Sequence, residues 1–146
     1  MEAYALEIGG MAFGRSCERF EAMLCWLDGP QAQELTHGEL EAWLQAEGRE
    51  LLGQLTQDHL DLRAARETRA EQVVGVDGVR RGNVETGRTR GLATVCGPVT
   101  VPRSTYRAPG HASLHPADGV LNLPAEKYSH GLRGRRACHA NCVSHG

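Results

Sequence analysis

Apolar residues near the start of the chain recur at intervals of three and four positions. They are Phe13, Cys17, Phe20, Leu24 and Leu27. This spacing places them on one face of a helix that starts near Ser16. The sequence Asp28-Gly29-Pro30 ends that helix, because glycine and proline interrupt helical geometry.

A second and longer helix is predicted from Thr36, which has the spacing of a capping box with Glu39. The apolar stripe that follows, at positions 40, 43, 44, 51, 52, 55, 60 and 62, extends to about residue 69. Such a helix would be about 50 Å long, longer than a small domain is wide. We therefore expect it to pack on the first helix and on a second copy of the chain. The expected packing or dimer positions are Leu40, Leu44, Leu51 and Leu55.

Glycines within this stripe leave an alternative open. Gly48 and Gly53 each disfavour a helix by about 1 kcal/mol relative to alanine. A break near residue 48 is therefore the competing interpretation.

The pattern changes after residue 73 to one rich in Gly, Val, Thr and Arg. Two short β-prone runs flank Gly97-Pro98, and a two-residue loop that begins with glycine suits a type II′ turn. This predicts a β-hairpin from about 89 to 106. Pro102 cannot donate a ladder hydrogen bond, so its strand should lie at an edge or end there. Residues 107–124 are predicted to be loop with a short helix at most.

The expected fold class is α+β, with two N-terminal helices, the second long, followed by a small β-hairpin lobe and an irregular C-terminal tail. We assign residues 1–72 to a helical region with a possible dimerisation role. Residues 73–128 form a basic hairpin lobe, and residues 129–146 form the tail.

Charge divides the chain into unlike halves. Residues 1–72 contain fourteen acidic residues and six arginines, a net charge of −8, whereas residues 73–146 contain four acidic and ten basic residues, a net charge of +6. The basic half suits a polyanion, and the acidic half suits solvent or a protein partner. Two ordinary solvated faces are the alternative.

Arginines gather around the predicted hairpin, and a hairpin can lie along a nucleic-acid backbone with arginines gripping phosphates. We predict DNA contacts by Arg88, Arg90, Arg103 and Arg107, with Arg80 and Arg81 upstream. Arginines that merely solvate a short sheet are the alternative.

No apolar run approaches the roughly 20 residues of a membrane span, and no basic region precedes an apolar one at the N-terminus. We expect a cytoplasmic protein without membrane contact. The five scattered cysteines do not form a disulfide framework, so reduced thiols are expected.

Catalytic signatures such as a P-loop, GxSxG or CxxC are absent from the sequence. Asp77-Gly78 and Asp118-Gly119 are interpreted as turn-forming dipeptides and not as metal ligands. The tail crowds Cys138, His139, Cys142 and His145 into one short peptide, a poor geometric match to a zinc site, which usually draws on two separated pairs. No metal or cofactor site is predicted in this chain.

Three segments occur in a recognisable order. They are ELTHGELEAWLQAEGRELLGQLTQDHLDLRA, VETGRTRGLATVCGPVTVPRSTYR and LHPADGVLNLPAEKYSHGLR. Together they resemble the N-terminal region of the ISKra group of bacterial insertion-sequence transposases, over residues 13–133. The ordered series is more specific than any one segment.

The resemblance implies a role in DNA transposition and recombination, in which the protein recognises and moves its own insertion sequence. This N-terminal region would bind the ends of the element or dimerise. In such proteins three acidic residues of a downstream RNase H-like core hold two Mg²⁺ ions for phosphoryl transfer. Nothing here matches that core, so no catalytic residue is carried over, and we expect this chain to be inactive as an enzyme by itself.

The chain departs from the family pattern at Cys96, Pro98 and Pro102, which could weaken the hairpin. After YSHGLR the family continues into an alanine-rich helix, whereas here GRRACHANCVSHG follows. We interpret this tail as a truncation or frameshift scar. For the function of the chain, the alternatives to a transposase fragment are a non-enzymatic protein-interaction module and a non-functional pseudogene product.

Overall fold

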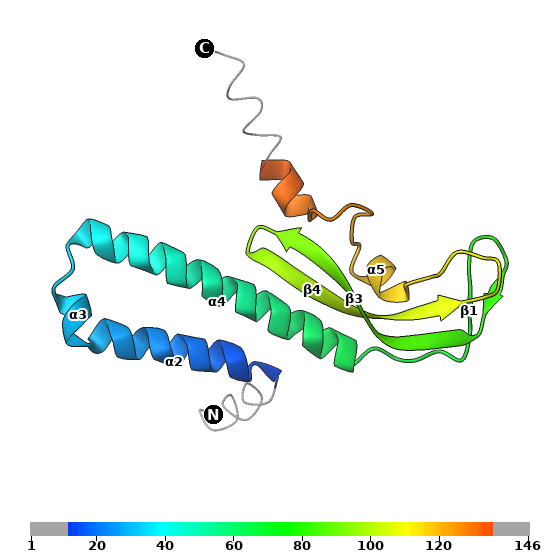
Figure 1. The fold of residues 1–146 in the computed structure, drawn as a ribbon, viewed down its shortest axis with the longest axis horizontal. Coiled ribbons are helices and arrows are strands. Elements are labelled where there is room, and N and C mark those ends of the chain that lie inside the picture. Colours follow the sequence, from blue (N-terminus) through cyan, green and yellow to red (C-terminus); the bar gives the residue numbers. More distant parts are fainter. Residues whose placement is uncertain (1–11, 136–146) are drawn as a thin grey trace, which may run out of the picture. The chain divides into compact units, whose positions relative to one another are not determined.

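The computed structural model describes residues 12–135, which belong to two compact units, Met1–Leu62 and Arg63–Gly146 (Figure 1). Helices dominate the first unit and antiparallel strands the second, so the predicted α+β class is confirmed. The first unit ends within a helix, ten residues before the boundary that composition suggested at residue 72. Each unit is described by itself.

The first unit contains two antiparallel helices, α2 (Gly14–Asp28) and α4 (His37–Ala65), connected by the short helix α3 (Pro30–Gln33). Helix α2 ends where Asp28-Gly29-Pro30 predicted. Helix α3 is not predicted by the sequence pattern. It begins at Pro30 because the fixed φ angle of proline suits the first turn of a helix.

Helix α4 begins with the predicted capping box. The Thr36 hydroxyl accepts a hydrogen bond from the Glu39 amide at 3.3 Å, and the Glu39 carboxylate accepts one from the Thr36 amide at 2.8 Å. The helix passes through Gly48 without a break, so the competing interpretation is wrong. It ends at Ala65, about one turn before the predicted end near residue 69.

Few side chains are buried between α2 and α4. Trp26 stacks on Trp43 with ring centroids 4.2 Å apart. Nearly three helical turns along α2 from Trp26, the Ser16 amide and hydroxyl donate to the buried Asp58 carboxylate at 3.1 and 2.7 Å. Met23 is the only large apolar residue of this unit that is buried within the described chain. Helices α2 and α4 are therefore joined mainly by these two contacts and fully bury little apolar surface.

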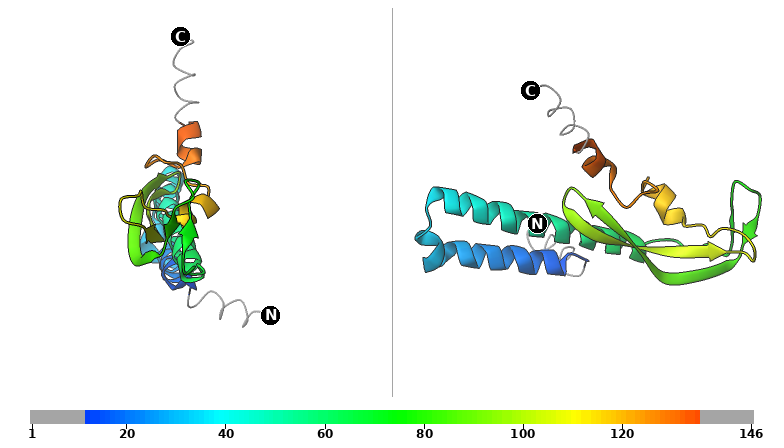
Figure 2. Two further views of the ribbon diagram at one scale, coloured as in Figure 1. Left: turned by 90° about the vertical axis from the view of Figure 1, so that its right-hand side faces the viewer. Right: turned by 45° about the horizontal axis from the view of Figure 1, so that its top comes forward.

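The second unit is built from two antiparallel strand pairs, each a two-stranded sheet. Strands β1 (Val73–Val74) and β2 (Arg80–Arg81) form a short hairpin, and β3 (Asn83–Thr94) and β4 (Gly97–Arg107) form a long one. Helix α5 (Pro116–Val120) lies against one side of the long ribbon (Figure 2). The hairpin and the short helix in the loop that follows are thus confirmed.

The turn of the long hairpin lies two residues before the predicted one. Thr94 pairs with Gly97, which leaves Val95-Cys96 as the loop and makes Gly97 the first residue of β4. The Thr94 hydroxyl fixes this turn by accepting from the Cys96 amide at 3.1 Å and donating to the Gly97 carbonyl at 2.7 Å. Gly97 has a φ of +100°, which is why glycine is needed there.

The two prolines of β4 do not interrupt it. Pro98 is paired with Ala93, whose amide and carbonyl bond outward to Lys127 and Ser129 rather than to β4. Along an antiparallel ladder, hydrogen-bonded residue pairs alternate with pairs that share no backbone hydrogen bond. Pro102 lies four residues after Pro98 and therefore also belongs to a pair that needs no amide hydrogen. The strand therefore continues to Arg107 and does not end at Pro102, whereas the other predicted alternative, an edge strand, holds because the sheet has only two strands.

The core of this unit lies on one face of the ribbon and at its base. Its buried apolar residues are Leu92, Val99, Val101 and Tyr106. The phenol of Tyr106 accepts from the Ala70 amide at 3.0 Å, which anchors the chain entering the unit. Tyr106 is therefore a core residue of this unit.

The start of the predicted irregular tail is helical, since residues 130–135 form a helix that the Ser129 side chain caps at the Leu132 amide. The remainder of the tail, with its Cys and His residues, lies outside the described residues. Within residues 12–135 no helix combines the length and the apolar character that a membrane span requires.

Candidate nucleic-acid interface

The hairpin register places the four predicted DNA-contact arginines on the same face of the ribbon. Arg88 is directly opposite Arg103, and Arg90 is opposite Val101. Side chains alternate between faces along a strand, so Arg107 joins Arg103 on this side. This is also the side of the buried Leu92, Val99 and Val101, so the arginines border the core and do not line the open face.

Arg90 and Arg103 clamp one carboxylate. The guanidinium groups of both donate to Asp118 Oδ2, Arg90 at 3.2 Å and Arg103 in a very short contact. Arg90 also donates to the carbonyls of Pro124 and Glu126. Their side chains are only 14% and 16% exposed. These two arginines fasten α5 and residues 124–126 to the ribbon. Asp118 and Gly119, predicted to form a turn, lie within α5, and Asp118 is an ion-pair partner.

The clamp is incompletely satisfied. Arg103 Nε and Asp118 Oδ1 are buried and find no hydrogen-bond partner among the described residues. Two like charges face each other across the strands at Arg88 and Arg103, which disfavours the pairing unless carboxylates offset it. Asp118 supplies that offset for Arg103.

Arg88 and Arg107 share a different carboxylate. Glu85 accepts from Arg88 at 2.8 Å through one oxygen and from Arg107 at 3.1 Å through the other. A one-residue bulge between Glu85 and Arg88, with Gly87 at a φ of +78°, lets both arginines reach it. Their side chains are 53% and 45% exposed, so this group leaves one net positive charge open to a ligand.

The two upstream arginines also differ, with Arg81 buried in an ion pair and Arg80 exposed. Arg81 is 2% exposed and forms a bidentate ion pair with Asp77, at 2.7 and 3.1 Å, while its Nε donates to the Ala112 carbonyl. Hydrogen bonds from Arg81 and from the Val79 amide hold the pKa of Asp77 well below its usual range. Asp77 thus serves the β1–β2 turn, as predicted, whereas Arg80 is exposed.

Three further arginines, at and beyond the end of α4, escaped the sequence prediction. Arg63, Arg66 and Arg69 are exposed and make no ion pair with another described residue. Arg69 also lines a pocket of about 200 Å³ with Arg103, beside the Gly87 bulge. Their spacing of three residues is the signal that could have found them, but they fall within the region predicted to be acidic and helical.

His115 marks the buried edge of this arrangement. Its Nδ1 lies 3.2 Å from the Thr105 hydroxyl. Burial, assisted by the positive charge of Arg103, lowers the pKa of His115. The ring is therefore neutral near pH 7 and adds no charge to the interface.

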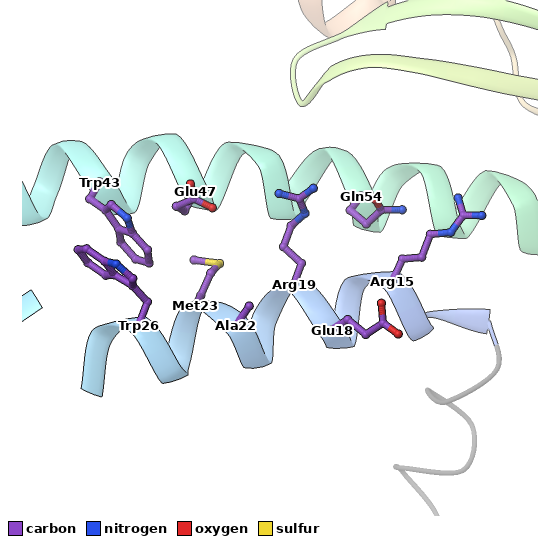
Figure 3. A pocket seen from close by; sticks show the side chains of 9 residues that line it. All are labelled: Arg15, Glu18, Arg19, Ala22, Met23, Trp26, Trp43, Glu47 and Gln54. Atoms are coloured by element: carbon purple, nitrogen blue, oxygen red, sulfur yellow. The ribbon is translucent and has the colours of Figure 1, made fainter. Parts of the chain in front are cut away.

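The helical unit has a pocket of about 660 Å³ between α2 and α4, with the stacked tryptophans at one end and Arg15 and Gln54 toward the other (Figure 3). Charges of both signs line it, among them Arg19, Glu18 and Glu47. No nucleophile with a neighbouring base lies among these residues, so the pocket suggests no reaction.

Metal-binding groups are not found in the described part of the chain, where no three His, Cys, Asp or Glu side chains converge. Asp77 and Asp118 are both occupied by arginines, so these carboxylates do not fit an Mg²⁺ site. Cys17, Cys25 and Cys96 are free thiols. Comparison with known proteins finds no match to a family model, a curated protein or a solved structure.

Proposed function

We propose that this chain is the DNA-binding N-terminal part of an insertion-sequence transposase, with the second unit contacting phosphates at the element ends. The observation that carries the proposal is the excess of exposed arginine. Residues 63–135 contain twelve basic and six acidic residues. Arg63, Arg66, Arg69 and Arg80 are exposed and lack an ion-pair partner among the described residues.

The four arginines chosen from the sequence take two roles in this proposal. Arg88 and Arg107 contact phosphate, because their side chains are about half exposed and share one carboxylate. Arg90 and Arg103 act as positioning residues. Their ion pairs with Asp118 hold α5 on the ribbon and thereby fix the surface around Arg88 and Arg107. Phosphate contacts set register and affinity but carry no sequence information by themselves, so the proposed preference for the element ends requires base contacts or DNA shape in addition.

The proposal assigns binding and no bond-breaking step to this chain. The resemblance to the ISKra group supplies the substrate, the ends of the mobile element, and the wider role in DNA recombination. Mg²⁺ would serve a downstream core in such proteins, and no described residue of this chain is assigned to it.

Fluorescence anisotropy with a duplex that carries the inverted repeats flanking the gene tests the proposal, with a scrambled duplex as the control. We expect preference for the repeats and an affinity that falls steeply with salt. If Arg80, Arg88 and Arg107 each neutralise one phosphate, the log–log slope is about −0.9 × 3, or roughly −3, and it is steeper if Arg63, Arg66 and Arg69 join them. Equal binding to both duplexes, or none, would contradict the proposal.

A second candidate is a non-enzymatic protein-interaction module, which the exposed apolar residues of α2 and α4 favour. Under this candidate the basic unit is incidental, and DNA binding is absent or indifferent to sequence. The anisotropy experiment therefore separates the two functions. A protein without a cooperative thermal transition would indicate the third alternative, a remnant that does not fold.

A further inference from the structure

The helical unit leaves five large apolar side chains exposed. The five are Phe20, Leu24, Leu44, Leu52 and Leu55, and their exposed fractions run from 37% to 52%. None of them lines the pocket between α2 and α4. We call these five residues the apolar face.

The five residues share one side of the helix pair. With about 100° per residue, Phe20 and Leu24 lie to one side of the inward line through Ser16 and Met23, and the pocket residues Arg19 and Trp26 lie to the other. In α4 the inward line passes through Asp58. Leu44, Leu52 and Leu55 lie to one side of it, and the pocket residues Trp43 and Gln54 to the other. Because the helices are antiparallel, these two apolar sides fall on the same surface.

We infer that the apolar face is the interface at which two copies of this chain pair, with α2 and α4 of each copy forming a four-helix bundle. The inference rests on the helical unit alone and not on the proposed DNA binding. It divides the predicted packing or dimer positions between the two roles, with Leu44 and Leu55 in the dimer face and Leu40 and Leu51 in packing. Leu40 and Leu51 are less exposed than Leu44 and Leu55, and Phe20 and Leu24 of the first helix, absent from that prediction, contribute as much.

A partner adds burial that the helix pair lacks, because most of its large apolar residues are only half-buried. Only Met23 among its large apolar residues is buried within the described chain, and helices in water depend on packing of an apolar face for most of their stability. A second copy supplies that packing, since two-fold pairing of equal two-helix faces gives the layout of a four-helix bundle.

The size of the face fits a second copy. Helix α2 has 15 residues and is about 22 Å long. Two helices side by side are about 20 Å wide, so the face projects to about 450 Å². Pairing two such faces covers about 900 Å² in projection, and more when side-chain relief is counted, close to the roughly 1,000 Å² that specific interfaces exceed.

Part of the charge lies away from the apolar face, since Arg15, Glu18, Arg19 and Glu47 line the pocket on the other surface. By the same construction Glu41, which contacts His37 at 2.9 Å, lies on the side of Leu52. Two acidic copies therefore repel each other, and salt screens this repulsion. Pairing should accordingly tighten or stay constant as salt increases, whereas DNA binding weakens.

Gly48 supplies an independent observation. It lies on α4 one turn from both Leu44 and Leu52, and a Cβ at this position would meet nothing within 4 Å. Nothing in the described chain therefore requires glycine here, although it disfavours the helix relative to alanine. Close approach of a second helix gives the missing reason, because glycine lets backbones come near.

Sedimentation velocity of the full chain at several concentrations tests the inference. We expect a dimer for the wild type and at least a tenfold higher dissociation constant for Leu52→Lys. Ala46→Lys is the matched control, since Ala46 is exposed on the same helix but lies away from the face, and it should leave the dimer intact. A monomeric wild type, or a Leu52→Lys protein that dimerises as well as the control, overturns the inference.

A second variant guards against simple loss of folding. Gly48→Gln favours the helix by propensity and has open space around it in a single chain, yet it blocks close approach of a partner. We expect it to keep its helical circular dichroism and raise the dissociation constant at least fivefold. A Gly48→Gln dimer as tight as the wild type would overturn the inference, as would a wild-type melting temperature that does not rise with protein concentration. Because no DNA is present, failure here leaves the proposed function standing.

Discussion

Replacing Asp118 by asparagine tests whether the carboxylate clamp holds the second unit together. The side chain accepts from Arg90 and Arg103, and the three side chains are 14% to 24% exposed. A hydrogen bond to a charged group contributes about 1.5–3 kcal/mol, and removing one partner of a fully buried pair costs about 3–5 kcal/mol. Arg90 keeps its two carbonyl partners, and the clamp is partly solvated and incompletely satisfied.

The low end of these ranges therefore applies, and we expect Asp118→Asn to lower the free energy of unfolding by about 2–3 kcal/mol. For a unit of this size that corresponds to a fall of roughly 10–20 °C in melting temperature, measured by circular dichroism. The matched control is Glu126→Gln, whose carboxylate lies 3.9 Å from Arg133 with both side chains more than half exposed. It should change stability by less than about 1 kcal/mol. Equal melting temperatures for the two variants would refute the clamp.

Three further predictions follow from single contacts. Glu85→Gln should strengthen DNA binding about fivefold at low salt, since it frees Arg88 and Arg107 and removes a repulsion of about 1 kcal/mol; titration of a labelled duplex measures this, and weaker binding would count against both arginines. Stability should fall as pH drops below about 6.5, because the pKa of His115 is lower in the folded chain than in the unfolded one, so protons bind the unfolded state first; melting between pH 7.5 and 5 should show the fall, and His115→Gln should flatten it. Thr36→Ala should cost about 1 kcal/mol through loss of the capping box; urea unfolding checks this, and an unchanged midpoint would argue against the cap.

Local signals in the sequence were sufficient for most elements of the fold. The spacing of Thr36 and Glu39 specified the start of α4, and Asp28-Gly29-Pro30 specified the end of α2. The hairpin turn was misplaced because Gly97-Pro98 looks like a loop. The Thr94 hydroxyl instead fixes the turn at Val95-Cys96, two residues earlier.

Only part of the candidate interface could be predicted from the sequence, because the partners of its arginines lie far away along the chain. Correct register puts Arg88, Arg90 and Arg103 on the face of Leu92 and Val101, and arginines bordering a core need carboxylate partners. That Asp118, 28 residues after Arg90, is the partner follows from the folding of α5 onto the ribbon, which no local pattern contains.

Salt-dependent binding to the flanking inverted repeats tests the central claim most directly. The comparison is between the wild type and a variant in which Arg80, Arg88 and Arg107 are all replaced by glutamine. These arginines are exposed and do not take part in the Asp118 clamp. We predict preferential binding by the wild type and a log–log salt slope shallower by about 3 in the variant, with an unchanged melting curve. An identical slope for both proteins would contradict the account.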